Sequence, residues 1–205
     1  MSDQVKVAVI YYSATGSVHA LALAAADAAT GEGAEVRLHK VRELAPDAAI
    51  QSNEVWAAHA EQTESVPEAS IDDLEWADVI LLGSPTRFGL PAAQVKQFID
   101  LAGPLWAQGK LVDKIASSFT STGTAHGGQE TTITAINNTF YHWGAIIVAP
   151  GYADPIQFKS GNPYGTSHIS NNGANPPGET ELAAIAFQAR RAVQVAARLK
   201  RGTQA

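Results

Sequence analysis

Three segments that predict strands, residues 5–12, 79–83 and 115–120, are each followed at once by a loop rich in glycine and hydroxyl side chains. The first segment is β-branched and aromatic and carries a single charge, at Lys6. Apolar runs without alternation are typical of strands that are covered on both faces, as in parallel sheets. Ligands of such sheets bind outside the carboxyl ends of the strands. We therefore expect the three loops to converge on one crevice.

Helical segments alternate with these strands. Residues 19–30 are rich in alanine and leucine, which favours a helix, and residues 35–39 predict a second strand, so that the first 40 residues form a βαβ unit. The pattern predicts an α/β fold, doubly wound, with a five-stranded parallel sheet and helices on both faces. Further helices are expected over 53–64, 91–101 (opened by Pro91), 129–141 and 179–200, with a strand over 145–149.

A single domain over residues 1–202 is expected, with a tail at 203–205. The chain has 205 residues, of which 45% are hydrophobic and 17% charged, a composition typical of one globular domain. Residues 150–178 are rich in glycine, proline and asparagine, and we expect them to form a long loop insertion with a functional or interface role.

The charge and the missing residue types exclude several classes of function. A formal net charge of −6 argues against a nucleic-acid partner. The absence of cysteine excludes disulfides and thiolate catalysis, and the histidines show no metal-ligand spacing, so no metal site is predicted. Residues 1–4 lack the basic start of a signal peptide, and the apolar run behind them is too short to span a bilayer. We expect a cytoplasmic protein without membrane insertion.

The first loop, residues 13–18, joins a strand to a helix N-terminus, where free N–H groups and a partial positive charge suit a phosphate. Ser13, Thr15 and Ser17 add hydroxyl donors, and Gly16 permits a close backbone approach. The loop lacks the ending of a Walker A motif and is not a Gly-x-Gly-x-x-Gly motif. An ordinary hydroxyl N-cap explains the same residues.

The other two loops admit similar alternatives. A buried or half-buried Arg87 beside Phe88 suits a flat conjugated ring, but the pair also fits a solvated turn anchored to the core by Phe88. Residues 121–128 would present backbone N–H groups to a ligand, or form a flexible linker. His142 could cap a helix C-terminus, and Trp106 could belong to the core or to an interface.

Taken together, the loops resemble the WrbA family of FMN-dependent NAD(P)H:quinone oxidoreductases, which have a flavodoxin-like fold. The resemblance extends over nearly the whole chain in order. The Pro-Thr-Arg-Phe-Gly and Ser-Thr-Gly-Thr segments are its most specific parts. The matching residues are Tyr11 to Ser13, Gly83 to Gly89, Leu105 to Ala107, Ser121 to Thr124, Gly127 to Glu130 and Gly161 to Gly165.

The resemblance implies an enzyme that uses FMN to reduce quinones to hydroquinones by two electrons, in a ping-pong hydride transfer from NADH or NADPH. It also implies a homotetramer in equilibrium with a dimer. His142 would be the catalytic residue, reaching the cofactor from a neighbouring subunit, and Trp106 would line the quinone-binding space. The implied cofactor-binding residues are Ser13, Ala14, Thr15, Gly16, Ser17, Val18, Pro85, Thr86, Arg87, Phe88, Gly89, Ser121, Thr122, Gly123, Thr124, Ala125, His126, Gly127 and His142.

Two other functions fit the same loops. A one-electron carrier of the flavodoxin type is favoured by the Thr15-Gly16-Ser17 run and the acidic balance, but it would need no enclosed substrate space. A protein that holds FMN without turnover is the second alternative. Turnover with NADH and benzoquinone distinguishes an enzyme from both.

Overall fold

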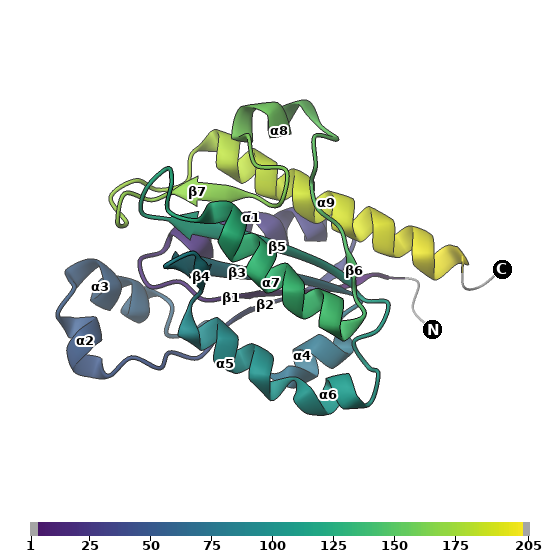
Figure 1. Ribbon diagram of the computed structural model, residues 1–205, viewed down its shortest axis with the longest axis horizontal. Coiled ribbons are helices and arrows are strands. Elements are labelled where there is room, and N and C mark those ends of the chain that lie inside the picture. The colour runs from purple at the N-terminus through teal and green to yellow at the C-terminus, as the bar shows by residue number, and fades with distance from the viewer. Residues whose placement is uncertain (1–3, 203–205) are drawn as a thin grey trace.

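A parallel sheet runs through the middle of the chain, whose residues 4–202 are described by the computed structural model. The strand order is β2-β1-β3-β5-β6, so the chain moves outward from β1 on one side and then crosses to the other (Figure 1). This is the flavodoxin order, with its switch point between β1 and β3. The predicted fold class is confirmed. The bounds are β1 (Lys6–Tyr11), β2 (Glu35–Lys40), β3 (Val79–Arg87), β5 (Ile115–Thr122) and β6 (Ile146–Ile147).

Helices cover both faces of this sheet. Side chains alternate along each strand, so that Val7 and Val9 face one layer while Ala8 and Ile10 face the other, and all four are buried. Burial on both faces explains the uninterrupted apolar runs over residues 7–11 of β1 and 79–82 of β3. One layer holds α1 (Ser17–Gly31) and α9 (Glu179–Gly202), and the other holds α4 (Ile71–Trp76), α5 (Ala93–Leu101), α6 (Gly103–Ala107) and α7 (Gln129–Trp143).

The segment between β2 and α4 projects beside the carboxyl ends of the strands, at the left of Figure 1. It contains α2 (Asp47–Gln51) and α3 (Glu54–Gln62), so the helix expected over 53–64 is confirmed in a shorter form. Asn53 is its N-cap, because Asn53 Oδ1 accepts hydrogen bonds from the N–H groups of Val55 and Trp56, both at 3.1 Å.

The segment expected as a loop after residue 83 continues as strand, which corrects the sequence-based prediction. β3 runs on to Arg87 and pairs antiparallel with β4 (Leu90–Pro91). Phe88 and Gly89 form the two-residue turn between them, with φ of 55° and 80°. Pro91 therefore belongs to a strand and does not open the helix. α5 instead begins at Ala93. The N–H of the preceding residue, Ala92, donates to Ser84 Oγ at 2.9 Å.

Residues 150–178 are also more ordered than expected. They contain α8 (Pro155–Ser160) and β7 (Ser167–Ile169), and β7 pairs with the outer half of β5. The strand expected over 145–149 is reduced to β6, which pairs only with Ile115 and Ala116 of β5 and leaves the rest of that edge to β7. The expected tail at 203–205 lies outside the described residues. No helix within residues 4–202 is long and apolar enough to cross a membrane.

Candidate functional site

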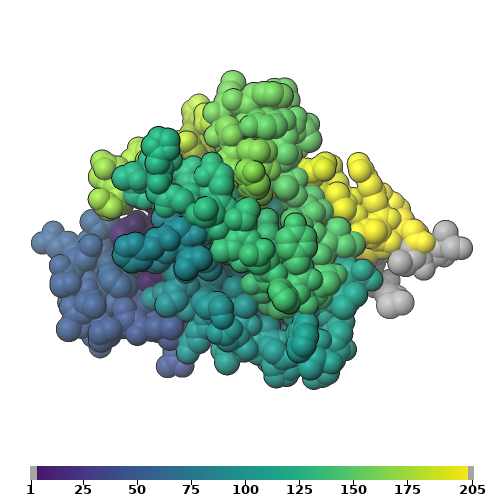
Figure 2. Space-filling model, viewed as in Figure 1, coloured from purple at the N-terminus to yellow at the C-terminus, as the bar shows by residue number. Residues whose placement is uncertain are grey.

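A cavity of about 270 Å³ lies at the carboxyl ends of β1, β3 and β5. In Figure 2, purple atoms of the N-terminal part of the chain are visible at the bottom of a hollow between the blue and teal segments. All three predicted loops contribute to the lining, so their expected convergence is observed. The lining residues are Ser13, Ala14, Thr15, Ser17, Val18, Asn53, Pro85, Thr86, Arg87, Ser121, Thr122, Gly123, Ser170 and Asn172.

The first loop presents the start of α1 to this cavity. Gly16 is the N-cap residue with φ of 92°, a conformation that L side chains rarely adopt, and among the described residues no side chain caps the helix. The alternative interpretation of this loop as an ordinary hydroxyl N-cap is therefore not supported by the described residues. Ser13 Oγ accepts the Gly16 N–H at 3.1 Å, which leaves the Ser13 hydroxyl hydrogen to donate elsewhere. The first turn of α1 thus keeps N–H groups for an anion.

The third loop contributes a buried hydroxyl without a partner. Ser121 Oγ is fully shielded and makes no hydrogen bond to any described residue. Its neighbour Thr122 donates to Thr124 O at 2.8 Å and accepts from Gln129 Nε2 at 3.1 Å, so the loop is held by its own contacts rather than being a flexible linker. A buried polar atom is normally satisfied, and an orphaned one that lines a cavity indicates a ligand.

The second loop is the hairpin tip of β3 and β4. Thr86 Oγ1 donates to Gly127 O at 3.2 Å and accepts from Thr132 Oγ1 at 2.8 Å, which ties the hairpin to the third loop. Arg87 is exposed, not buried, and its Nη1 donates to Thr86 O at 2.9 Å. Phe88 is fully exposed at 105% relative accessibility, so it does not anchor the turn to the core. Arg87 lines the cavity, whereas Phe88 does not.

An acidic group is held beside the hairpin. Glu43 accepts hydrogen bonds from Tyr12 Oη at 2.8 Å and Gln94 Nε2 at 2.6 Å. Burial alone would raise the pKa of Glu43, but these bonds and the Ala45 N–H hold it below its ordinary value. Burial, followed by the Glu43 bond, raises the pKa of Tyr12. These hydrogen bonds therefore fix the chain after β2 and satisfy the Glu43 carboxylate.

A row of aromatic rings supports the first loop from behind. Tyr11 stacks on His19 with ring centroids 5.1 Å apart, and His19 lies 5.2 Å from the ring of His59. His59 Nδ1 lies only 3.5 Å from the position that a Cβ on Gly16 would take. Burial, then the neighbouring His19, lowers the pKa of His59 to about 4, and burial also lowers that of His19. Both rings are neutral near pH 7.

Several predicted residues lie outside the cavity lining. Gly16 contributes through its backbone, whereas Phe88, Gly89 and residues 124–127 surround the cavity without lining it, and His126 is exposed. Trp106 and His142 lie together elsewhere, where Trp106 Nε1 donates to His142 O at 2.8 Å, and both line a different cavity of about 440 Å³.

The position of His142 follows from the direction of α7. The helix starts at the third loop and runs back along the sheet, and His142 is in its last turn rather than after it. Thirteen residues of helix span roughly 20 Å. His142 therefore lies near the opposite end of the sheet from the cavity of its own chain.

Three lining residues were missed by the sequence analysis: Asn53, Ser170 and Asn172. Asn53 precedes a helix and could have been recognised as an N-cap, but nothing in the sequence places that helix beside the first loop. Ser170 and Asn172 belong to the segment interpreted as a long loop insertion, for which a functional or interface role was expected without naming either residue.

The lining residues fit FMN. The uncapped start of α1 suits a terminal phosphate, and the orphaned Ser121 hydroxyl needs a polar partner from a ligand. Among the described lining residues Arg87 is the one charged side chain, so a phosphate would be held mainly by neutral donors.

Known proteins share this sequence and fold. A "NAD(P)H dehydrogenase (quinone)" of Deinococcus radiodurans is 48% identical over 200 residues, covering 97% of this chain and 99% of that protein. A protein of the same name from Methylocella silvestris is 41% identical over 201 residues, covering 95% of this chain and 98% of that protein. The resemblance stated from the sequence is therefore confirmed.

Among solved structures, a flavodoxin, WrbA-like protein from Agrobacterium tumefaciens matches with a TM-score of 0.68 and 23% identity, covering 95% of this chain and 99% of that one. At this identity the match supports the fold alone. The family model for NADPH-dependent FMN reductase matches residues 5–157, which contain all three loops. The chain belongs to the NADPH-dependent FMN reductase family.

Proposed function

We propose that this protein is an FMN-dependent NAD(P)H:quinone oxidoreductase that reduces quinones to hydroquinones by two electrons. The observation that carries the proposal is the orphaned, buried Ser121 hydroxyl in a cavity that also receives the uncapped start of α1. Relatives that cover nearly the whole chain are named NAD(P)H dehydrogenase (quinone), which supports the same activity. FMN, when bound, supplies the two-electron chemistry between the nicotinamide donor and the quinone.

The first and third loops would hold the phosphate and ribityl parts of FMN. The N–H groups at the start of α1 and the hydroxyls of Ser13, Thr15 and Ser17 line one wall of the cavity, and Ser121 lies opposite. These donors are fixed before a ligand arrives, since Ser13 is positioned by Gly16 and the third loop by its internal hydrogen bonds. Pre-positioned neutral donors lower the entropic cost of binding an anion.

The hairpin tip would contact the flavin ring. Thr86 is used in tying the hairpin to the third loop, so its role is to position the tip, whereas the exposed Arg87 guanidinium has donors left for ring carbonyl oxygens. A guanidinium at that place would stabilise negative charge on the reduced ring. Phe88 would supply apolar contact beside it.

We also propose a cytoplasmic homotetramer in equilibrium with a dimer, in which His142 and Trp106 of one chain complete the site of another. The support is geometric: both residues are exposed and lie together at the far end of the sheet from their own cavity. His142 would then donate a proton or a hydrogen bond to the quinone oxygen. Light scattering across protein concentrations tests the assembly, and a purely monomeric active enzyme would refute it.

The activity is tested by an absorbance spectrum of the purified protein with FMN, followed by anaerobic NADH or NADPH and then benzoquinone. Bleaching of the bound flavin by the nucleotide and its recovery with the quinone is the expected result. Bound FMN that no nucleotide bleaches would favour the carrier or the binding protein instead. We propose a ping-pong order, which predicts parallel initial-rate lines; intersecting lines would contradict it.

A further inference from the structure

A fourth segment, far from the three loops in the sequence, reaches the same cavity. β7 extends the outer half of β5, with His168 opposite Ser121 and Ile169 opposite Thr122. Directly after β7, the Ser170 N–H and hydroxyl both donate to Thr122 O, at 2.7 and 3.0 Å. The turn at residues 170–173 is therefore fixed to the third loop by its first residue.

The backbone of this turn is unusual. Asn171, Asn172 and Gly173 have φ of 46°, 55° and 93°, so three successive residues are left-handed and two of them carry side chains. Such a conformation costs free energy for residues other than glycine, and asparagine tolerates it best. It is maintained here by hydrogen bonds from Gly173 N and Asn175 N to Ser170 O, both 2.9 Å. Backbone strain of this kind concentrates at binding sites.

Asn172 lies across the gap between the first and third loops. Its Oδ1 is 2.9 Å from the position that a Cβ on Gly123 would occupy. The next residue is close to the first loop, since a Cβ on Gly173 would lie 3.0 Å from Thr15 Cβ. Asn172 lines the cavity, and its amide makes no hydrogen bond to any residue in 4–202.

We propose that Asn172 is a binding residue for the FMN phosphate, which its side-chain amide contacts from the turn at residues 170–173. A strained backbone holds the exposed Asn172 side chain at the edge of a cavity whose phosphate end is otherwise built from neutral donors. An amide N–H that donates to a phosphate oxygen fits this arrangement. The inference rests on the proposed FMN site and adds to it a residue outside the three loops.

The test compares Asn172→Gly with Asn171→Gly. Glycine accepts the left-handed backbone at both positions, so both variants are expected to fold with an unchanged melting temperature or a slightly higher one. Asn171 does not line the cavity and is the matched control. The dissociation constants of FMN and of riboflavin, which lacks the phosphate, are measured for each protein by quenching of flavin fluorescence.

We expect Asn172→Gly to weaken FMN binding about tenfold, the effect of losing one hydrogen bond to a charged group. Riboflavin binding should change less than about twofold, as should FMN binding to Asn171→Gly. Asn172→Asp, which places a carboxylate in the same position, should weaken FMN more than the glycine variant does because it repels the phosphate.

Two results would overturn the inference: FMN binding to Asn172→Gly as tight as to the unaltered protein, or an equal loss for FMN and riboflavin. Either can occur while the unaltered protein still binds FMN, so the proposed function would survive. Failure of the unaltered protein to bind FMN would instead refute the proposed function itself.

Discussion

The two ends of the central sheet each carry a cavity of nearly the same size, about 270 Å³ at the carboxyl end and about 250 Å³ at the amino end. They differ in the state of their polar groups. The carboxyl end presents an orphaned buried hydroxyl, that of Ser121, and an uncapped helix start. The amino end is lined by lysine and aspartate side chains, and the charged groups of Asp78, Lys110, Lys114 and Lys200 are bound within the protein.

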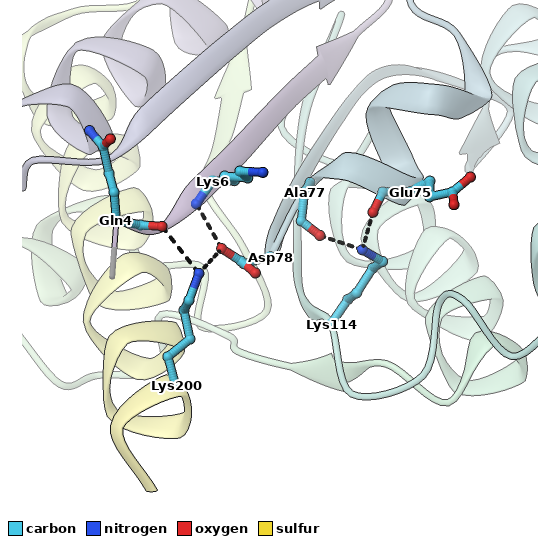
Figure 3. A network of polar contacts seen from close by, with 7 residues as sticks. All are labelled: Gln4, Lys6, Glu75, Ala77, Asp78, Lys114 and Lys200. Carbon is cyan, nitrogen blue, oxygen red and sulfur yellow. Dashed lines mark hydrogen bonds and ion pairs between the residues drawn. The ribbon is translucent and has the colours of Figure 1, made fainter. Parts of the chain in front are cut away.

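Figure 3 shows how the charges at the amino end are used. Asp78 Oδ2 accepts the Lys6 N–H at 2.9 Å and Lys200 Nζ at 2.7 Å, which ties α9 to the start of β1. Lys114 Nζ donates to the carbonyl oxygens of Glu75 and of Ala77, at the end of α4. Cavity size therefore does not distinguish a binding site here, whereas unsatisfied polar groups do.

The largest effect that we expect comes from His59, a buried base at the carboxyl end that forms no ion pair with an acidic side chain of residues 4–202. Its folded-state pKa is about 4, against roughly 6.5 in the unfolded chain, so between these values the unfolded chain binds more protons. The contribution of neutral His59 to the free energy of unfolding is fully present above pH 6.5. It is lost as the pH falls toward 4, which lowers the free energy of unfolding by about 3 kcal/mol. Urea unfolding from pH 7.5 to 4 measures it in the FMN-free protein.

The variant His59→Gln should lose that part of the pH dependence, whatever its stability at pH 7.5. The exposed His126 provides the control, because His126→Gln should leave the profile unchanged. A His59→Gln profile as steep as that of the unaltered protein would show that His59 is not buried neutral.

At the amino end, Lys114→Met should lower the free energy of unfolding by about 2 kcal/mol, because two carbonyl oxygens lose a charged donor. FMN affinity should not change. Lys110→Met is the matched control: its ion pair with Glu75, at 2.6 Å, is about 40% exposed and should contribute less than about 1 kcal/mol. Denaturant unfolding and FMN titration provide both readouts, and a weakened FMN affinity in Lys114→Met would contradict the comparison.

Ser121→Ala should have the opposite effect to Lys114→Met: it should change FMN affinity but not stability. FMN binding should weaken about tenfold, while the FMN-free protein should be as stable as before, because the hydroxyl has no partner among the described residues. On the same strand, Thr120 Oγ1 donates to Ser84 O at 2.7 Å, so Thr120→Val should cost stability but not FMN affinity. Thermal unfolding and fluorescence titration would distinguish the two variants. If Ser121→Ala bound FMN as tightly as the unaltered protein, the Ser121 hydroxyl would not be an FMN ligand.

The smallest effect is expected from Asp78→Asn, which keeps an acceptor for the Lys6 N–H and removes only the charge facing Lys200. Both side chains are about 30% exposed, so the loss should be at most about 1 kcal/mol and should shrink in 1 M salt. Unfolding at low and high salt tests this. A loss that does not depend on salt would indicate that packing rather than charge joins α9 to β1.

The fold was predictable because burial on both faces of a parallel strand leaves a direct trace in the sequence. The apolar run in β1 and the alanine-rich α1 predicted the βαβ unit correctly. The hairpin after β3 was not predicted, since a turn at Phe88 and Gly89 with two positive φ values is uncommon for phenylalanine. Helices α2, α4 and α6 have no more than six residues each, too few for a recognisable period.

The sequence by itself determined the α/β class, the three loops and their neutral hydroxyl chemistry, because these depend on residues that are neighbours along the chain. Only the tertiary structure decided that Asn53 and Asn172 line the same cavity, and that Ser121 rather than the equally polar Thr120 is left without a partner. It also decided that α7 carries His142 roughly 20 Å away from the cavity of its own chain. The crossover connections of the sheet and the pairing of β7 with β5 bring these residues together. Both join segments that are far apart in the sequence, so no local pattern predicts the contact.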